Sequence, residues 1–144
     1  MSVLATATAR FGERAAFRVG RAESGAWPRD LQFDVVLMFG LIHHLGDAEV
    51  GAMLTAVSAN MGSATRVVTL DGCFDDRQSK IAKLMIKMDR GRNVRTESQY
   101  RSLFEQHFVS VRSFVRHDLL TIPYTHCILE CCKTPDASSG LNAG

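Results

Sequence analysis

The sequence has 144 residues, of which 46% are hydrophobic, and its 17 lysines and arginines against 15 aspartates and glutamates leave a formal charge of +2. One domain with a buried core fits this length, whereas two independent domains do not. So small a net charge gives no signal for a nucleic-acid or membrane partner, and no segment reaches the roughly 18 to 20 unbroken apolar residues that span a bilayer. Because the N-terminus also lacks a secretory signal pattern, we expect a cytoplasmic protein.

The first third of the chain predicts a helix end and two strands. Residues 1–13 indicate the end of a helix rich in small residues, and residues 15–19 predict a short strand. Residues 33–39 (FDVVLMF) are almost wholly apolar after Asp34. Such a run is typical of a central strand that is covered on both faces in a parallel sheet.

A confident helix pattern follows, with Asp47 as its cap and Gly62 as its end. Its inward stripe is formed by Val50, Met53, Leu54, Val57 and Met61. Residues 65–70 are rich in β-branched side chains and predict the next strand, which leaves the sheet at Asp71 and Gly72. A strand, a helix and a strand in this order place the ends of both strands at one edge of a parallel sheet.

The second half of the chain predicts two helices and a closing pair of strands. Residues 78–90 carry one apolar helical stripe, formed by Ile81, Leu84, Met85 and Met88, and Gly91 ends that helix. Residues 96–99 (TESQ) form a capping box that opens a further helix. Residues 109–118 and 125–132 predict an antiparallel strand pair. The fold class is therefore α/β over residues 1–132, and the polar tail 133–144 is expected to be disordered.

Two adjacent histidines stand at the predicted sheet edge. Gly40 allows a tight turn after the strand, and His43 and His44 follow at once. A neutral imidazole at such an edge is suited to act as a general base near neutral pH. The alternative is that one histidine hydrogen-bonds within the turn and the other is solvated. Asp71, at the same edge, would either orient an imidazole or bind a substrate hydroxyl, or would only cap the turn at Gly72.

Three other polar groups admit both a functional and a structural interpretation. Cys127, Cys131 and Cys132 have part of a metal-ligand pattern, but without a matching second pair they fit small core residues better, reduced like Cys73. The arginines of residues 90–95 would clamp a carboxylate or phosphate, or would form a solvated connector that pairs with acidic neighbours. The doublet at residues 75–76 resembles a metal-binding pair, and helix capping is its simpler role.

The order of these motifs resembles a known family. Residues 33–36, residues 41–45 (LIHHL) and residues 66–71 (RVVTLD) look like the second half of a class I S-adenosylmethionine (SAM)-dependent methyltransferase of the small-molecule kind. Residues 89–95 (DRGRNVR) and 122–126 (IPYTH) are similar to a bacterial subgroup of it.

The resemblance covers roughly residues 10–132 and implies a truncated Rossmann-like methyltransferase sheet, mostly parallel, with SAM as cofactor and a small molecule as methyl acceptor. It implies His43 or His44 as the base, Asp71 as a substrate contact, and backbone contacts from Phe39 and Gly40 to the cofactor.

The sequence also departs from the family. Its glycines never form the Gly-x-Gly-x-Gly loop that approaches the cofactor, and no acidic residue matches the one that holds the ribose. Where the family has Gly-Asp-Ala near the adenine, this chain has Gly20, Arg21 and Ala22, and an arginine side chain accepts no hydrogen bond. We therefore expect the C-terminal part of the fold only, without the glycine-rich cofactor half.

Loss of the first strands would leave one edge of the 33–39 strand open, and something must cover it. A homodimer is the favoured solution, because symmetric dimers are the commonest oligomers, and a rearranged short strand or a partner chain is the alternative. Two functions follow: a methyltransferase with a histidine base, or a catalytically impaired interaction or regulatory subunit that pairs through this edge. A nucleic-acid module is disfavoured, because no aromatic residues are interleaved with the arginines.

Overall fold

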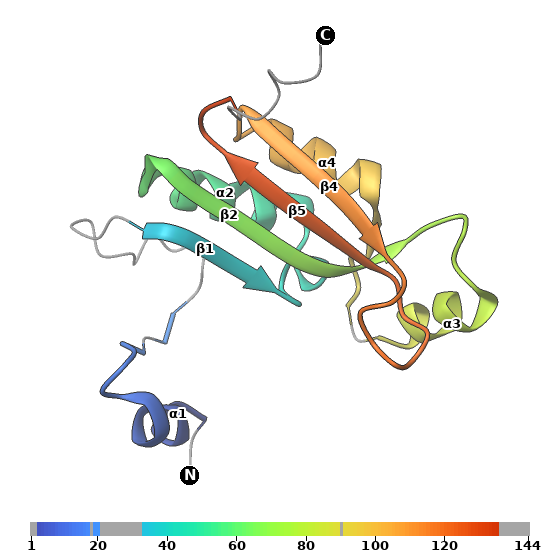
Figure 1. The fold of residues 1–144 in the computed structure, drawn as a ribbon, viewed down its shortest axis with the longest axis horizontal. Helices are drawn as coiled ribbons and strands as arrows, with labels where there is room; N and C mark the ends of the chain where they lie inside the picture. Colours follow the sequence, from blue (N-terminus) through green and yellow to red (C-terminus); the bar gives the residue numbers. More distant parts are fainter. Residues whose placement is uncertain (1–2, 18, 21–32, 90, 136–144) are drawn as a thin grey trace, which may run out of the picture.

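The computed structural model describes residues 3–17, 19–20, 33–89 and 91–135, and its centre is a mixed sheet with helices packed on one face (Figure 1). In chain order the elements are α1 (Val3–Phe11), β1 (Phe33–Phe39), the 3-10 turn η2 (Ile42–His44), α2 (Asp47–Ala59), β2 (Met61–Phe74), α3 (Lys80–Met88), β3 (Arg95–Thr96), α4 (Glu97–Glu105), β4 (Ser110–Arg116) and β5 (His126–Cys132).

The predicted strand, helix and strand are confirmed as β1, α2 and β2. The two strands pair in parallel, with Phe39 opposite Leu70 at the carboxyl end of β1. The helix boundaries differ from the prediction. Gly46 occupies the N-cap position ahead of Asp47, and its backbone N–H donates to the Glu49 side chain over 2.9 Å. Asn60, rather than Gly62, ends the helix, so that Met61 already belongs to the strand.

The prediction that β1 is a central strand covered on both faces is wrong. The strand order is β1-β2-β5-β4, which places β1 at an edge, and its outer side pairs with no other strand among the described residues. Met38 is buried in the core, whereas Val35, Leu37 and Phe39 on the opposite face are 51%, 59% and 58% exposed. The apolar run therefore reflects one packed face and one uncovered apolar face.

The second half of the chain folds largely as predicted. β5 lies between β2 and β4 and runs antiparallel to both, while the two-residue β3 pairs in parallel with β2. The capping box of α4 is present, with Thr96 as N-cap and Gln99 closing it. The α/β fold class, with a parallel first pair and an antiparallel C-terminal pair, is confirmed.

Helix α3 differs from its prediction. It ends at Asp89 instead of Gly91, and its buried residues are Ala82 and Ile86. The predicted stripe is largely solvent-exposed, with Ile81 at 61%, Leu84 at 57% and Met88 at 73%. The amphipathic pattern identified a helix correctly, but the described residues cover little of its apolar face.

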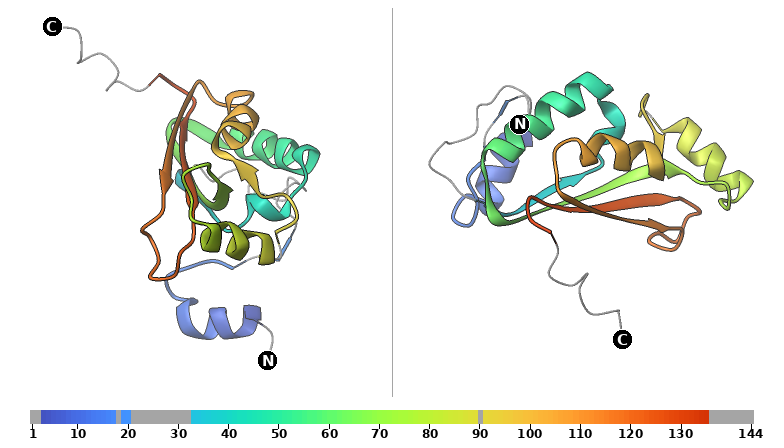
Figure 2. Two further views of the ribbon diagram at one scale, coloured as in Figure 1. Left: turned by 90° about the vertical axis from the view of Figure 1, so that its right-hand side faces the viewer. Right: turned by 90° about the horizontal axis from the view of Figure 1, so that it is seen from above.

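The layers are plain in Figure 2, where α2 and α4 lie on one side of the sheet.

Residues 15–17 and 19 form no strand, so the strand predicted there is wrong for those residues. The predicted tail begins with residues that contact the sheet, since Lys133 and Thr134 donate to the Met61 and Ser63 carbonyls, and residues 136–144 lie outside the described part. Within the described ranges, no helix has the length and hydropathy needed to cross a bilayer.

Candidate functional site

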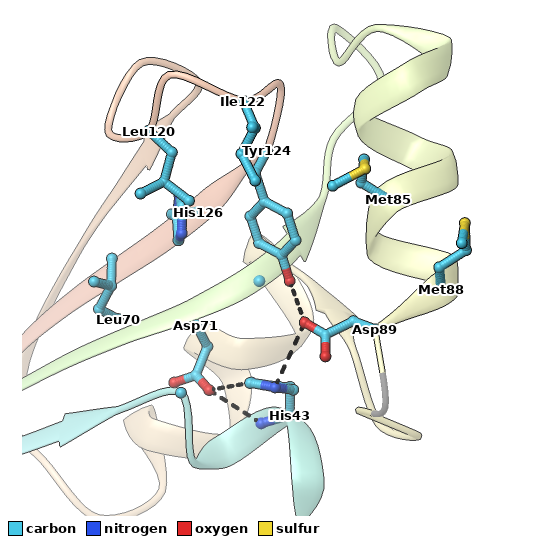
Figure 3. Close-up of a pocket in the computed structure, with 12 residues that line it drawn as sticks. His43, Leu70, Asp71, Met85, Met88, Asp89, Leu120, Ile122, Tyr124 and His126 are labelled. Atoms are coloured by element: carbon cyan, nitrogen blue, oxygen red, sulfur yellow. Dashed lines mark hydrogen bonds and ion pairs between the residues drawn. The ribbon is translucent and has the colours of Figure 1, made fainter.

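A cavity of about 540 Å³ opens where β1 ends and β2 continues (Figure 3). It is lined by Gly40, His43, Leu70, Asp71, Gly72, Met85, Met88, Asp89, Leu120, Ile122, Tyr124 and His126. The carboxyl ends of parallel strands are where ligands bind in open α/β sheets. Two of the predicted site residues, His43 and Asp71, meet here, as expected from the parallel pairing.

Gly40 directs the chain from β1 toward this cavity. It has φ +61°, a left-handed conformation that glycine adopts without strain, and its N–H donates to the Leu70 carbonyl over 2.8 Å. The chain then turns through η2, which carries His43 and His44. A β-carbon at Gly40 would be strained because of this φ, so the short turn depends on glycine.

His43 is bound to Asp71 by two hydrogen bonds to the same oxygen. The ring Nδ1 lies 2.7 Å from Asp71 Oδ1, and the backbone N–H of His43 donates to Oδ1 over 3.1 Å. Both residues are buried, at 6% and 2% exposure. Because an ionised carboxylate only accepts, it holds the proton on Nδ1 and leaves the lone pair on Nε2. The proposed turn-capping role of Asp71 is wrong, since Gly72 continues the strand.

Asp89 and Tyr124 stand on the other side of the imidazole. The Tyr124 hydroxyl donates to Asp89 Oδ2 over 2.6 Å, and the same oxygen lies 3.9 Å from His43 Nε2. That second distance is too long for a hydrogen bond. Burial, together with the hydrogen bond to Asp89, raises the pKa of the Tyr124 hydroxyl above its usual value. The Tyr124 hydroxyl therefore keeps its proton and donates it in a hydrogen bond to the Asp89 carboxylate. His43 Nε2 has no direct hydrogen bond to Asp89.

Arg95 fixes the turn that carries the histidines. Its guanidinium donates to the carbonyls of Ile42 and Leu45 over 3.2 and 2.8 Å, and to Asp47 Oδ1 over 2.6 and 3.0 Å. These bonds join the end of η2 to the start of α2, so Arg95 is a buried structural clamp and not part of a solvated connector. Sequence reasoning missed this role, because a lone arginine before a capping box does not show what it contacts.

Gly91 leaves the space that the His43 ring occupies. A β-carbon built there would overlap the ring carbon Cδ2 of His43 and would lie 3.1 Å from its Cγ and its backbone oxygen. Nearby, the Asn93 N–H donates to the His43 carbonyl over 3.0 Å. The segment before β3 therefore shapes the back of the imidazole site. Gly91 was read as a helix terminator, a role that belongs to Asp89.

The outer wall of the cavity is apolar and ends at a second histidine. The rings of Tyr124 and His126 are 4.8 Å apart between centroids, and His126 Nδ1 is buried without a hydrogen-bond partner in the described residues. Burial lowers the pKa of His126, with Asp71 acting weakly in the opposite direction. Leu120 and Ile122 are 49% and 48% exposed at this wall.

The other sequence candidates lie in different places. His44 is exposed, and its ring lies 4.1 Å from that of His43 between centroids at an interplanar angle of 42°, but His44 does not line the cavity. Gly40 lines the cavity, and Phe39, 58% exposed, precedes it. Gly20 is exposed, whereas Arg21 and Ala22 lie outside the described residues.

The described residues contain no group of three or more histidines, cysteines, aspartates or glutamates that could hold a metal. All four cysteines are buried with free thiols, so their prediction as core residues is confirmed. The doublet at 75–76 does not cap α3, because Ser79 is the N-cap and accepts from the Ala82 N–H. Asp75 instead lies 3.1 Å from Nε2 of His117.

Comparison with solved structures places this arrangement in the fold of SAM-dependent methyltransferases. The sequence matches no protein-family model and no curated protein sequence. The chain superposes on human N-acetylserotonin methyltransferase in complex with SAM with a TM-score of 0.66 and 16% identity, over 92% of this chain and 38% of that one. For PigF with SAH the TM-score is 0.67 and the identity 18%, over 90% and 39%.

A third match is N,N-8-amino-8-demethyl-D-riboflavin dimethyltransferase from Streptomyces davawensis, with a TM-score of 0.61 and 20% identity, over 92% of this chain and 40% of that one. At these identities the comparison establishes the fold and no more. The chain spans about two fifths of the length of these structures, and it has the fold of their C-terminal part.

Proposed function

We propose that this chain is the base-bearing part of a SAM-dependent methyltransferase that acts on a small-molecule acceptor, with His43 as the general base. The observation that carries the proposal is the 2.7 Å contact between His43 Nδ1 and Asp71 Oδ1, which turns Nε2 toward the cavity. The matched structures, several of them described with SAM or SAH, support it. Asp71 then serves as the residue that orients the base.

The proposed chemistry needs few protein groups. SAM, when bound, supplies a methyl group on a positively charged sulfur. The nucleophile attacks the methyl carbon and displaces the sulfur directly as the leaving group. His43 Nε2 would take the proton from the acceptor's hydroxyl or amine as the new bond forms. The imidazolium then carries a positive charge between Asp71 and Asp89, 2.7 and 3.9 Å from the two ring nitrogens. Both carboxylates stabilise that charge by Coulomb attraction.

The described residues fit SAM only in part. Phe39 and Gly40 stand at the end of β1, where the family places backbone contacts to the cofactor, and the left-handed Gly40 leaves the backbone there without a side chain. No described strand lies beyond β1 to carry a glycine-rich loop or a carboxylate for the ribose. We therefore propose that this chain alone binds SAM weakly, and that tight binding requires a further segment beside β1.

Methyl transfer from isotope-labelled SAM to a panel of small hydroxyl and amine acceptors tests the function. Binding of SAM is followed in parallel by calorimetric titration. We expect His43→Ala to lower the rate by about 10²- to 10⁴-fold, the usual contribution of a general base. His44→Ala is the matched control, because His44 is adjacent and exposed and does not line the cavity. Equal losses in the two variants, or none in His43→Ala, would refute the assignment.

A second candidate function is favoured by a different observation, the open edge of β1. Val35, Leu37 and Phe39 form an exposed apolar row beside an edge that pairs with no described strand. Open edges of this kind are ready surfaces for pairing with another chain. We propose, as the alternative, an interaction or regulatory subunit that forms a homodimer through this edge. Wild-type chain that neither binds SAM nor transfers methyl groups even at millimolar SAM would favour this candidate over the first.

Sedimentation velocity separates the second candidate from the first. We expect a dimer that dissociates when Leu37 is replaced by lysine, because a charge would then face the apolar row. Leu84→Lys is the control, since Leu84 is 57% exposed on α3, away from β1. A wild-type monomer across the micromolar range, or equal dissociation of both variants, would contradict pairing through β1.

A further inference from the structure

The cavity combines apolar walls with negative charge. Of the residues that line it, Met85, Met88, Leu120 and Ile122 are apolar, whereas the ionisable ones are two aspartates, two histidines and Tyr124. None of the described lining residues is a lysine or an arginine. The buried guanidinium of Arg95 donates to Asp47 and to the Ile42 and Leu45 carbonyls, and Arg95 does not line this cavity.

Three of the hydrogen-bond donors that line the cavity are already engaged. His43 Nδ1 is bound to Asp71, the Tyr124 hydroxyl donates to Asp89, and the Gly40 N–H donates to the Leu70 carbonyl. An anion entering the cavity would have to displace one of these bonds or use the His126 ring, whose Nδ1 has no partner in the described residues.

The remaining ring, His126, stays uncharged near neutral pH because burial lowers its pKa. Beside it, Asp71 is 2% exposed and its Oδ2 has no hydrogen-bond partner in the described residues.

We propose that the acceptor is an uncharged or cationic molecule with an apolar body, and that Asp71 and Asp89 exclude carboxylates and phosphates from this cavity. This inference rests on the proposed function, which supplies the reason for an acceptor to bind in the cavity. Its physical content is binding selectivity by charge, which does not require methyl transfer. An alcohol or an amine can donate a hydrogen bond to a carboxylate in the cavity, whereas a carboxylate or phosphate meets a like charge among described lining residues that include no lysine or arginine.

Three probes of nearly equal size test this selectivity: 2-naphthalenemethanol, 2-naphthylmethylamine and 2-naphthoate. Saturation-transfer NMR titrations of the chain without cofactor give their affinities at neutral pH. Like charges about 6 Å apart near a protein surface repel strongly enough to weaken binding by at least tenfold, even after screening. We expect the amine and the alcohol to bind at least about tenfold more tightly than naphthoate.

Variants locate the effect in this cavity. Asp71→Asn and Asp89→Asn each remove one negative charge at similar size, and at least one of them should reduce the disadvantage of naphthoate severalfold. Asp118→Asn is the control, because Asp118 is exposed and pairs with Arg116 outside the cavity. Ile122→Trp should weaken all three probes by filling the cavity at a half-exposed position.

Each outcome decides the inference. Naphthoate that binds as tightly as the alcohol, an unchanged ratio in both cavity variants, insensitivity to Ile122→Trp, or no binding of any probe would overturn it. A chain that selects the probes by charge but transfers no methyl group even at millimolar SAM refutes the proposed function and leaves the charge selectivity standing. A chain that methylates a carboxylate-bearing acceptor in this cavity does the reverse.

Discussion

Replacing Gly91 with alanine should displace the His43 ring from its position. The new β-carbon would overlap the His43 ring, and the ring's Cγ and the backbone oxygen of His43 would lie only 3.1 Å from it. Carbon atoms pack at about 3.5 to 4.0 Å, so the ring or the 91–95 segment must move by more than about 1 Å. A shift of that size breaks the 2.7 Å bond between His43 and Asp71.

The expected loss of stability follows from that bond. A hydrogen bond to a charged group contributes about 1.5 to 3 kcal/mol, and a buried carboxylate left without its partner costs about 3 to 5 kcal/mol. These two contributions overlap, because both describe the same broken contact. We therefore expect Gly91→Ala to lower the free energy of unfolding by about 3 kcal/mol.

Urea unfolding followed by far-UV circular dichroism measures this change. Gly51→Ala is the control, because Gly51 lies within α2 and the nearest atom that its new β-carbon would meet is His107 Nε2 at 4.0 Å. In a helix interior alanine is favoured over glycine, so this variant should be more stable by up to about 1 kcal/mol. If Gly91→Ala unfolds within about 0.5 kcal/mol of the wild type, the segment moves easily and the argument that it shapes the imidazole site is wrong.

Three further predictions concern the buried polar groups. Arg95→Lys should lower the free energy of unfolding by about 2 kcal/mol in the same urea assay, because an ammonium does not reproduce the fork that bonds two carbonyls and a carboxylate; an unchanged midpoint would contradict the clamp. Burial raises the pKa of both tyrosines in the chain, Tyr100 and Tyr124, so ultraviolet titration of the folded protein should show no phenol ionising near pH 10, and a step there would count against the packing around them. Burial lowers the pKa of His126 below 6.5, so the unfolded chain binds a proton at this ring before the folded chain does. Stability should therefore fall as the pH drops below about 6.5, and it should fall less in His126→Asn. An identical pH dependence in the two proteins would contradict the burial of this ring.

The elements that could be predicted are those whose side chains carry a periodic pattern. The strand, helix and strand from residue 33 to residue 74 follow from an apolar run and from buried positions three and four apart in α2. The contact between His43 and Asp71 follows in turn, because the parallel pairing brings their segments to one edge. The capping box of α4 is likewise a local signal that the structure reproduces.

What could not be predicted depends on contacts between distant segments. An apolar pattern shows that a face can be buried but not what covers it. The pattern of β1 therefore predicts a central strand, and the stripe of α3 does not show its exposure, although Leu37 and Leu84 are both more than half exposed. The clamp of Arg95 onto Ile42 and Leu45 joins residues about fifty positions apart, and no local spacing encodes it. The same holds for Gly91, whose need to be glycine is set by the ring of another segment.

The cavity is assembled from two kinds of backbone, and this has an evolutionary consequence. The His43 imidazole is held in place by the hydrogen bonds of Arg95 to its turn, by the space that Gly91 leaves and by the buried Asp71 carboxylate. Leu120 and Ile122, in contrast, are half-exposed on the irregular connection between β4 and β5. Mutations at the latter positions can therefore change what the cavity accommodates while the geometry around His43 stays constant. A library randomised at residues 119–122 is the natural starting point for changing which molecules this scaffold binds.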